Sequence, residues 1–436
     1  MSTATKLSIA LPDVGRDAPI FVAYSGGLDS TVLLHALAAM REVRERGLRA
    51  IHIHHGLSDQ ADAWTAHCER VCASLGVPLH VAHVVVDRKS KLGLEAAARE
   101  ARQAALAAEM DDGALLALAH HRDDQAETFL LRALRASGPD GLAAMRRLRP
   151  FANGWLWRPL LDIPRETLRA YATTHALDFI EDPANDTLAH DRNYLRHKIM
   201  PLLRERWPHA DAALARSAAL SAQAATLLAD DDAQALAQAR TDDPRVLAID
   251  PLRALPAARR ARALRRWILE RGLPPLPAEG IAQIERDLAT NAPDTDFRFE
   301  WAGAELRRWR DLWRAAPVPA TLPPDWSDVW DGRMPMILPD GGTLALLGAP
   351  AFDTPLRVRL RRGGERIALP GRTHSHSLKH ALQDAGLPPW SRECLPLLVD
   401  GDDTVLAAGE GLVSAPFAAW LRRHDARLQW IPPAAD

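Results

Sequence analysis

The sequence predicts an α/β protein with a doubly wound, mostly parallel sheet in its N-terminal domain, followed by a helical domain and a small α+β C-terminal domain. From Pro19 to about Ile180, short apolar runs alternate with segments of helical periodicity, which is typical of βαβ units. After Trp207-Pro208 the chain becomes rich in Ala, Leu and Arg. A length of 436 residues suits two or three domains. We expect them at residues 1–208, 209–318 and 319–436.

Five apolar runs of strand length and three helical segments make up the N-terminal pattern. The predicted strands are Ile20–Tyr24, Ala50–His54, Leu79–Val86, Ala114–Ala119 and Asp178–Ile180. The predicted helices are Ser30–Arg41, Trp64–Leu75 and Leu94–Met110. Parallel strands joined by helices build a sheet that is covered on both faces, and ligands bind at the carboxyl ends of its strands. Residues that follow a strand are therefore the candidates for a site.

The rest of the chain changes its pattern twice. The segments Ala210–Arg240 and Ala257–Arg271 predict a mainly helical domain. Beyond the proline-rich stretch Pro317–Trp326, short strand-like runs such as Leu356–Leu360 accompany a helix at Ser377–Ala385. We expect a small α+β module there.

The composition is that of an ordinary globular protein. Hydrophobic residues at 47% and charged residues at 25% exclude a disordered, collagen-like or coiled-coil chain. With 54 basic and 56 acidic side chains, contacts to nucleic acid must come from local patches. Three cysteines cannot build a disulfide framework, which favours a reducing compartment. The sequence shows no signal peptide and no apolar run of membrane length, so we expect a cytoplasmic protein with no membrane partner.

The hexapeptide Ser25-Gly-Gly-Leu-Asp-Ser30 lies between a predicted strand and a predicted helix. Its two glycines let the backbone turn sharply and aim N–H groups inward, and the helix adds its positive end, which suits phosphate oxygens. Asp29 would repel phosphates unless a divalent cation lay between them, so we expect a magnesium-bridged triphosphate. The alternative is a Gly-Gly turn with ordinary helix caps, but the complete hexapeptide in this position favours the phosphate site.

A second cluster follows the fourth predicted strand, in His120-His-Arg-Asp-Asp-Gln-Ala-Glu-Thr128. If a helix begins near Asp123, then Asp124 and Glu127 share one face. An acidic first turn is also favoured by the helix dipole alone. Because the cluster is at the same sheet edge as the phosphate loop, we expect Asp124 and Glu127 to join Asp29 as catalytic residues and magnesium ligands. Replacing Asp29 or Glu127 with Ala should then abolish AMP formation without unfolding the protein.

Histidines at 52, 54 and 55 and again at 120 and 121 raise the question of zinc. The chain has no His-Glu-x-x-His and too few cysteines for common structural zinc sites, and alternating strand side chains point to opposite faces. We expect His55 or His120 to donate a hydrogen bond to a nucleotide or to stack on a base instead.

Several arginines are candidates for phosphate contacts. Arg192 and Arg196 are an i,i+4 pair that could bind phosphates or form salt bridges with nearby acids, which is the commoner fate of such a pair. Basic runs at 259–266 and 357–366 could contact a nucleic-acid backbone or be solvated faces.

The chain contains no Gly-Lys-Ser/Thr, which excludes a Walker-type P-loop. The hexapeptide resembles that of the PP-loop ATP pyrophosphatase superfamily, and the whole pattern resembles the bacterial tRNA(Ile)-lysidine synthetase family. The N-terminal segments carrying the resemblance are Ser25–Ser30, His55–Leu57, Glu95–Arg99, His120–Thr128, Arg158–Leu161, Asp182–Asn185 and Arg192-Asn193. The C-terminal ones are Arg362–Glu365, Ser377–Lys379, Leu382-Gln383 and Gly386–Trp390.

The resemblance implies an adenine nucleotide α-hydrolase-like N-terminal domain and a reaction in two steps. ATP adenylates the C2 carbonyl oxygen of the wobble cytidine in an isoleucine tRNA with a CAU anticodon. The ε-amine of free lysine then displaces AMP to form lysidine, and pyrophosphate is the other product. We also expect that the protein forms a homodimer.

Roles follow from the resemblance for three groups of residues. The ATP-binding residues would be Ser25, Gly26, Gly27, Leu28, Asp29, Ser30 and His55. Magnesium and the activated intermediate would be held by Asp29, Asp124 and Glu127. Contacts to tRNA or phosphate would come from Arg99, Arg192, Arg196, Arg259, Arg260, Arg362 and Lys379.

Two positions depart from the family pattern, and alternatives of function remain open. His54 stands where the family usually has Asn, and Arg135-Ala-Ser-Gly138 replaces Arg-Gly-x-Gly, which matters if Ala136 needs a positive φ. One alternative is a tRNA thiolase of the same superfamily, but Cys-x-x-Cys is absent. Another is a tRNA-binding protein with a vestigial nucleotide site, against which every expected phosphate-loop and carboxylate residue is present.

Overall fold

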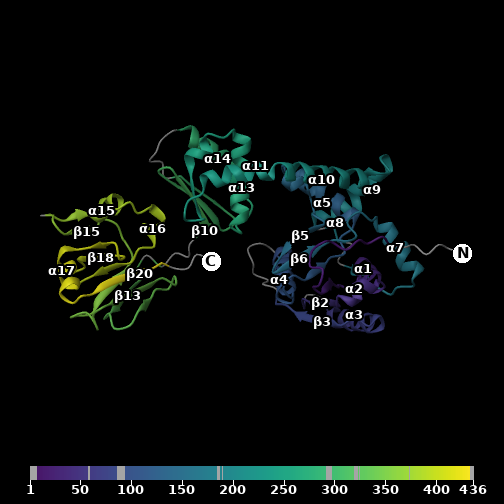
Figure 1. Cartoon of the computed structure of the whole chain (residues 1–436), viewed down its shortest axis with the longest axis horizontal. Helices are drawn as coiled ribbons and strands as arrows, with labels where there is room; N and C mark the ends of the chain where they lie inside the picture. Colours follow the sequence, from purple (N-terminus) through teal and green to yellow (C-terminus); the bar gives the residue numbers. More distant parts are fainter. Residues whose placement is uncertain are drawn as a thin grey trace. The chain divides into compact units, whose positions relative to one another are not determined.

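The computed structural model describes residues 7–56, 59–85, 94–183, 187–188, 190–290, 297–318, 323, 325–372 and 374–432. The chain divides into two compact units, Met1–Ala229 and Asp230–Asp436 (Figure 1). The boundary expected at residue 208 falls inside the first unit, and the three-domain scheme stays a prediction.

The first unit is built around a six-stranded sheet in the order β3-β2-β1-β4-β6-β5. Its strands are β1 (Ile20–Ala23), β2 (Leu48–His54), β3 (Leu79–His83), β4 (Leu115–Ala117), β5 (Leu148–Phe151) and β6 (Gly154–Trp157). All neighbours pair in parallel except β5 and β6, which form an antiparallel hairpin. The predicted mostly parallel sheet is confirmed. The hairpin was not predicted, and the strand expected at 178–180 is reduced to a single bridge between Gly27 and Ile180.

Helices cover both faces of this sheet, as predicted. Along β1, Ile20 and Val22 face one hydrophobic core, and Phe21 faces a second core together with Leu106 and Leu116. This alternation is what a strand buried on both faces requires. The helical segments are α1 (Leu28–Ala38), α2 (Arg41–Glu45), α3 (Ala61–Leu75), α4 (Leu94–Ala108), α5 (Arg122–Leu134), α6 (Pro139–Leu142), α7 (Arg165–Thr174), α8 (Asp191–Tyr194), the π-helix η2 (Leu195–Ile199), α9 (Met200–Arg206) and α10 (Ala210–Leu227). Helix α10 packs against α5 and α6.

The first part of the second unit contains a sheet that the sequence analysis missed. The helices of this part are α11 (Ala229–Ala239), α12 (Ile249–Arg253), α13 (Ala257–Glu270) and α14 (Ala278–Ala289). The strands of the sheet are β7 (Val246–Ala248), β8 (Arg298–Trp301), β9 (Ala304–Trp309) and β10 (Leu312–Pro317). They pair in the order β7-β10-β9-β8. The expectation of a mainly helical region was therefore incomplete. Strand β9 buries Glu305, Arg307 and Arg308, and these charged residues hide the apolar alternation of a strand.

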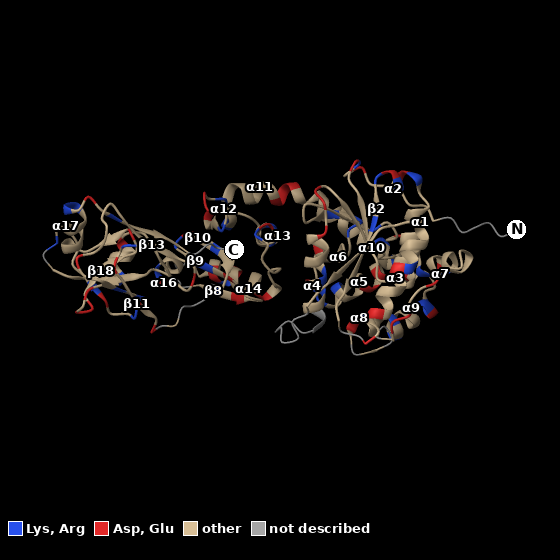
Figure 2. Cartoon of the chain, turned by 90° about the horizontal axis from the view of Figure 1, so that it is seen from below, with Lys and Arg blue, Asp and Glu red and all other residues tan. Residues whose placement is uncertain are grey.

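The remainder of the second unit is the expected α+β module. Its strands are β11 (Ser327–Trp330), β12 (Met336–Ile337), β13 (Thr343–Leu347), β14 (Leu356–Arg359), β15 (Arg366–Ile367), β16 (His376–Ser377), β17 (Leu397–Val399), β18 (Val405–Ala408), β19 (Leu412–Val413) and β20 (Arg427–Ile431), and its helices are α15 (Leu378–Asp384), α16 (Pro389–Glu393) and α17 (Ala415–Arg423). Basic and acidic positions are interspersed along both units (Figure 2). No helix in the described part of the chain has the length and hydropathy needed to cross a bilayer.

Ala136 adopts the conformation in which a glycine is expected. It follows helix α5 with a φ of 53°, and the amide of Ser137 donates to the carbonyl of Arg132 (3.1 Å). A left-handed residue after a helix is usually Gly, because a Cβ atom there is strained by roughly 1–2 kcal/mol. We expect Ala136→Gly to raise the free energy of unfolding by about 0.5–1 kcal/mol. Urea unfolding should also show that the control Ala133→Gly, inside α5, lowers it by about 1 kcal/mol; a loss of stability in both variants would contradict the strain at Ala136.

Candidate active site

The predicted phosphate loop connects β1 to α1 and requires glycine at position 26. Gly26 has a φ of +80°, and a Cβ atom placed on it would lie 2.5 Å from Cδ1 of Ile180 and 3.0 Å from Sγ of Cys68. The carbonyl of Gly26 accepts a hydrogen bond from the amide of Ile180 (2.9 Å). The loop is therefore held against the 178–180 segment and has no room for a side chain.

The N-terminus of α1 presents donors at the carboxyl end of β1. Gly27 is the N-cap and supplies no side-chain cap, and the first intrahelical hydrogen bond runs from the amide of Thr31 to the carbonyl of Gly27 (3.0 Å). The hydroxyls of Ser25 and Ser30 lie 3.1 Å apart, and Ser30 also donates to the carbonyl of Gly27 (3.0 Å). The amides of the first helical turn thus have no intrahelical acceptor, which is the arrangement that binds phosphate at a helix end.

Helix α5 begins at the carboxyl end of β4 with a buried capping box. The amide of His121 donates to Oδ2 of Asp124 (3.0 Å), and the amide of Asp124 donates to Nδ1 of His121 (3.4 Å). This reciprocal pair fixes both side chains at the sheet edge. The helix starts one residue before the predicted position, so Asp124 and Glu127 share a face as expected.

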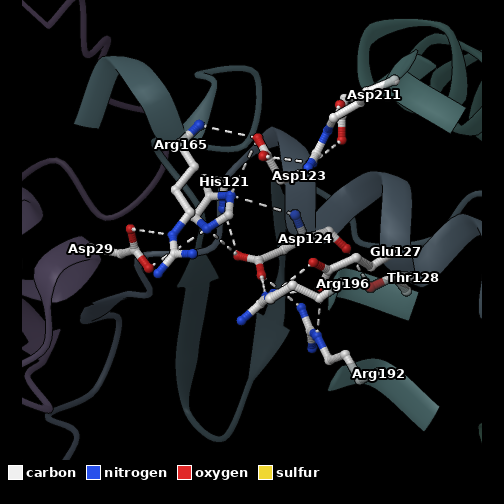
Figure 3. Close-up of polar contacts among 11 residues, drawn as sticks. Asp29, His121, Asp123, Asp124, Glu127, Thr128, Arg165, Arg192, Arg196 and Asp211 are labelled. Carbon is white, nitrogen blue, oxygen red and sulfur yellow. Dashed lines mark hydrogen bonds and ion pairs between the residues drawn. The ribbon is translucent and has the colours of Figure 1, made fainter. Parts of the chain in front are cut away.

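Asp124 and Glu127 are held by two arginines from α8 and η2 (Figure 3). Arg192 donates to Glu127 (3.0 Å) and to Asp124 (2.9 Å), while Arg196 donates to Glu127 (2.7 and 2.9 Å) and to Asp124 (2.8 Å). The Glu127 side chain is only 1% exposed. Although burial opposes it, the charges of His121, Arg192, His120 and Arg196 hold the pKa of Asp124 well below its usual range. For this arginine pair the salt-bridge alternative is therefore the arrangement observed.

His121 connects this cluster to Asp29. Its Nε2 atom lies 3.6 Å from Oδ2 of Asp29 and 3.3 Å from Oδ2 of Asp124, and the ring is almost completely buried. Burial lowers the pKa of His121, but the polar contact with Asp29 and the charges of Asp124, Asp29 and Asp123 raise it overall. Two carboxylates from separate strand ends thus share one imidazole. Sequence reasoning considered His121 only as a zinc candidate and missed this role, although its spacing to Asp124 is that of a capping box.

An outer layer of charges surrounds the site. Asp123 accepts hydrogen bonds from the amide of Arg165 (3.1 Å) and from Arg204 (3.1 Å), and Arg204 also binds Asp211 on α10 (2.6 and 2.8 Å). Helices α7, α9 and α10 are thereby joined to the first turn of α5. Sequence analysis did not identify Arg165, Arg204 or Asp211, because their partners are distant in the chain.

The described residues do not present a ready-made magnesium site on three carboxylates. Asp29, Asp124 and Glu127 do not form a group that could hold a metal ion, and no other such group of His, Cys, Asp and Glu occurs among the described residues. Arginines occupy the positions around Asp124 and Glu127. Asp29 differs, since its Oδ1 atom is buried and has no hydrogen-bond partner. Only Asp29 therefore fits as a cation ligand in this arrangement.

The other predicted binding residues are distributed over the chain. His55 is half-buried after β2, and burial together with the charges of Arg102 and His54 lowers its pKa. Leu28 is buried in α1, whereas Arg99 is exposed on α4. Arg192 and Arg196 reach the cluster described above. Leu57 and the residues from Ala184 to Asn185 lie outside the described residues.

The remaining predicted contacts belong to the second unit. Arg259 lies 3.6 Å from Asp231, whereas Arg260 is 8% exposed and binds Glu285 together with backbone carbonyls. Arg260 thus has a structural environment that is unsuited to a surface RNA contact. Arg362 and Lys379 are exposed.

The buried His120 side chain leads us to expect a loss of stability in mild acid. Burial and the charges of Arg158, Arg192 and His121, opposed by Asp124, lower its pKa from 6.5 to about 4. Between pH 6.5 and about 4, the His120 side chain binds a proton in the unfolded chain but not in the folded chain. The contribution of His120 to the free energy of unfolding is therefore complete above pH 6.5 and is lost as the pH decreases. His121 contributes the opposite dependence, but only above pH 6.5, where its raised pKa lies.

We expect the free energy of unfolding to fall by about 2 kcal/mol from this residue between pH 6.5 and 5. The variant His120→Asn, whose Oδ1 can still accept from Arg158, should show a smaller loss. Urea unfolding of both proteins at several pH values measures the difference. Parallel stability curves would contradict the role of His120.

These features define a class of protein. A parallel sheet whose first strand leads through a Gly-Gly loop into a helix, with no Walker sequence, is the arrangement of a PP-loop ATP-binding domain. The family model described as PP-loop domain matches residues 3–203. Models described as TilS substrate binding domain and TilS substrate C-terminal domain match residues 247–313 and 356–430.

Curated relatives narrow the class to one family. The tRNA(Ile)-lysidine synthase of Xanthomonas campestris pv. campestris (strain 8004) is 56% identical over 95% of each chain. Those of Xanthomonas axonopodis pv. citri (strain 306) and Xylella fastidiosa (strain Temecula1) are each 54% identical, over 98% and 96% of this chain and 96% of each relative. The chain belongs to the tRNA(Ile)-lysidine synthase family. The resemblance expected from the sequence is confirmed.

Proposed function

We propose that the protein joins free lysine to C2 of the wobble cytidine in an isoleucine tRNA with a CAU anticodon, using ATP and forming lysidine, AMP and pyrophosphate. The observation that carries this proposal is the meeting of the phosphate loop and the buried charged cluster at one sheet edge, in a chain whose relatives are tRNA(Ile)-lysidine synthases. The match to those relatives extends over both units.

The first step is adenylation. The C2 carbonyl oxygen of cytidine attacks the α-phosphorus of ATP, an oxygen–phosphorus bond forms, and pyrophosphate leaves with the electrons of the broken bond. We assign Ser25, Gly26, Gly27 and Ser30 to pyrophosphate, since the loop and the first turn of α1 present donors with no intrahelical acceptor. Such a step needs positioning and charge neutralisation more than a protein nucleophile.

The second step forms the carbon–nitrogen bond. The ε-amine of lysine attacks C2, AMP leaves with the oxygen, and the amine loses a proton. We assign Asp29, Asp124 and Glu127 to the reacting centre. His121 would hold Asp29 and Asp124 in register, because its Nε2 lies within 3.6 Å of both.

Magnesium, when bound, would supply positive charge to the phosphates of ATP. We propose Asp29 as the residue that holds it, because Oδ1 of Asp29 is buried and accepts no hydrogen bond, its ion-pair partner Arg165 being 3.8 Å away. The expected participation of Asp124 and Glu127 stays a prediction that requires Arg192 and Arg196 to move aside.

The test is incorporation of radiolabelled lysine into isoleucine tRNA with a CAU anticodon, in the presence of ATP and magnesium. The elongator methionine tRNA, which shares the anticodon sequence, is the control. Incorporation confined to the isoleucine tRNA, with release of AMP and pyrophosphate, is the expected result. AMP formation that depends on tRNA but occurs without lysine incorporation would contradict the lysine step and keep the adenylating site.

The two alternatives make different predictions. A thiolase would need reactive sulfur, whereas burial, with smaller contributions from neighbouring charges at Cys68, raises the pKa of Cys68 and of Cys72 to about 12, so neither thiol is poised to ionise. A vestigial site would give no AMP with any tRNA. The expected homodimer and cytoplasmic location stay predictions.

A further inference from the structure

Among the described residues, four arginines of the first unit form no ion pair with an acid. Other buried or half-buried arginines bind a carboxylate, as Arg196, Arg204 and Arg262 do. In the described part of the chain, no ion pair is formed by Arg99, Arg132, Arg149 or Arg158.

Arg158 is the most buried member and reaches the active-site edge. It directly follows β6, is 8% exposed, and donates from Nε to Nδ1 of His120 (3.1 Å) and from Nη1 to the carbonyl of Arg146 (2.7 Å). Both acceptors are uncharged. A guanidinium has five N–H donors, so Arg158 keeps donors and its full charge for another ligand.

Arg132 and Arg149 lie on elements that contact the surroundings of Arg158. Arg132 donates to the carbonyls of Gly141 and Ala144 (2.8 and 2.9 Å), in the segment that also supplies the acceptor for Arg158. Arg149 is on β5, which pairs with β6, and it donates to the carbonyl of Pro150 (3.1 Å). Arg149 also lies over the ring of Phe151, with 5.4 Å from Cζ to the ring centroid, and none of these contacts is to a carboxylate.

The charges of these arginines also repel one another. Burial and the charges of Arg149, Arg99 and Arg132 lower the pKa of Arg158 to about 10. Arg99 also contributes to the lowered pKa values of Arg132 and Arg149, after burial. Cations gathered without acids cost stability unless an anion binds among them.

We infer that Arg132, Arg149 and Arg158 form a phosphate-binding site for the RNA substrate, which holds a backbone phosphate beside the reacting nucleotide. This inference rests on the proposed function. An RNA phosphate is favoured over the carboxylate of an amino acid, because three cations from α5, β5 and the end of β6 suit an extended polyanion better than one carboxylate. Arginine also matches phosphate geometry with two parallel hydrogen bonds.

The experiment measures binding of CAU-anticodon isoleucine tRNA by Arg149→Gln and Arg158→Gln over a series of salt concentrations. Arg149 is only half-buried, so Arg149→Gln keeps the test valid if Arg158→Gln does not fold. The matched control is Arg41→Gln, whose side chain is 91% exposed and pairs with Glu45 on α2. KM values for lysine and ATP are measured on the same proteins.

We expect Arg149→Gln to weaken tRNA binding about tenfold, the loss of one charge-assisted hydrogen bond. The slope of log affinity against log salt should fall by about 0.7–0.9 for each phosphate contact removed. The control should keep the wild-type slope. A purely structural role would not change this slope.

Two results would overturn the inference. One is wild-type affinity and slope in folded variants, and the other is unchanged RNA binding with a raised KM for lysine, which would assign the site to a carboxylate. Failure of the proposed function is distinguishable, because the wild-type protein would then form no lysidine whatever the variants show.

Discussion

Asp29→Asn is expected to lower the rate of AMP formation at least about a hundredfold and to leave the fold intact. The Asp29 side chain is 28% exposed, and its two ion-pair distances, to His121 and Arg165, are long at 3.6 and 3.8 Å. Removing its charge therefore costs little stability. It removes the carboxylate of the phosphate loop, which has a buried oxygen that accepts no hydrogen bond. The rate of AMP formation in the presence of tRNA measures the first effect, and circular dichroism measures the second.

The control for this variant is Asp178→Asn. Asp178 is two residues before Ile180, whose amide donates to the carbonyl of Gly26 in the same loop, but its side chain is 86% exposed and lies 3.6 Å from His67. Its rate should stay within about twofold of wild type, as for a weak surface pair. A second readout is the pKa of His121, which Asp29 raises. We therefore expect His121 to titrate at a lower pH in Asp29→Asn than in the wild-type protein. Full turnover by folded Asp29→Asn would remove Asp29 from the reacting centre.

The position of the site could be predicted because it depends on local sequence. A strand followed by Gly26 and Gly27 specifies a loop, and a helix beginning near Asp123 brings Asp124 and Glu127 to one face. Both clusters follow parallel strands, so their meeting at one edge follows from sheet geometry. The sequence was therefore sufficient to place these residues at one sheet edge, and their roles in the reaction stay predictions.

The partners of those residues could not be predicted in the same way. Arg196 is 69 positions from Glu127 and reaches it only because α8 and η2 fold back onto α5. Nothing in the spacing of Arg192 and Arg196 distinguishes a phosphate contact from a carboxylate clamp. The sheet formed by β7 to β10 was missed for a related reason, since its buried charges are compensated by tertiary contacts such as Arg308 with Asp287 (3.0 Å).

The ion pairs that Glu127 forms with Arg192 and Arg196, here called the arginine clamp, change what is expected of Glu127. The sequence suggested that Glu127→Ala would abolish activity without unfolding, but the Glu127 carboxylate is buried and binds two arginines. Its removal leaves Arg192 and Arg196 with less compensation in a site of low exposure. We expect Glu127→Ala to lower the free energy of unfolding by about 3–5 kcal/mol, so its loss of activity would not report on chemistry. Urea unfolding of the first unit's transition measures this effect.

The matched variants separate the clamp from the reaction. Arg196→Ala removes one of the two cations, and in the double variant with Glu127→Ala the second change should cost less than it does alone. We expect a coupling of roughly 1–3 kcal/mol between the two positions, because each compensates the other's buried charge. Asp123→Ala, which leaves both arginines of the clamp paired, should be additive with Arg196→Ala to within about 0.5 kcal/mol. Additive effects of Glu127→Ala and Arg196→Ala would show that the ion pairs do not hold η2 against α5, and the carboxylate of Glu127 would then be free to serve the metal as first expected.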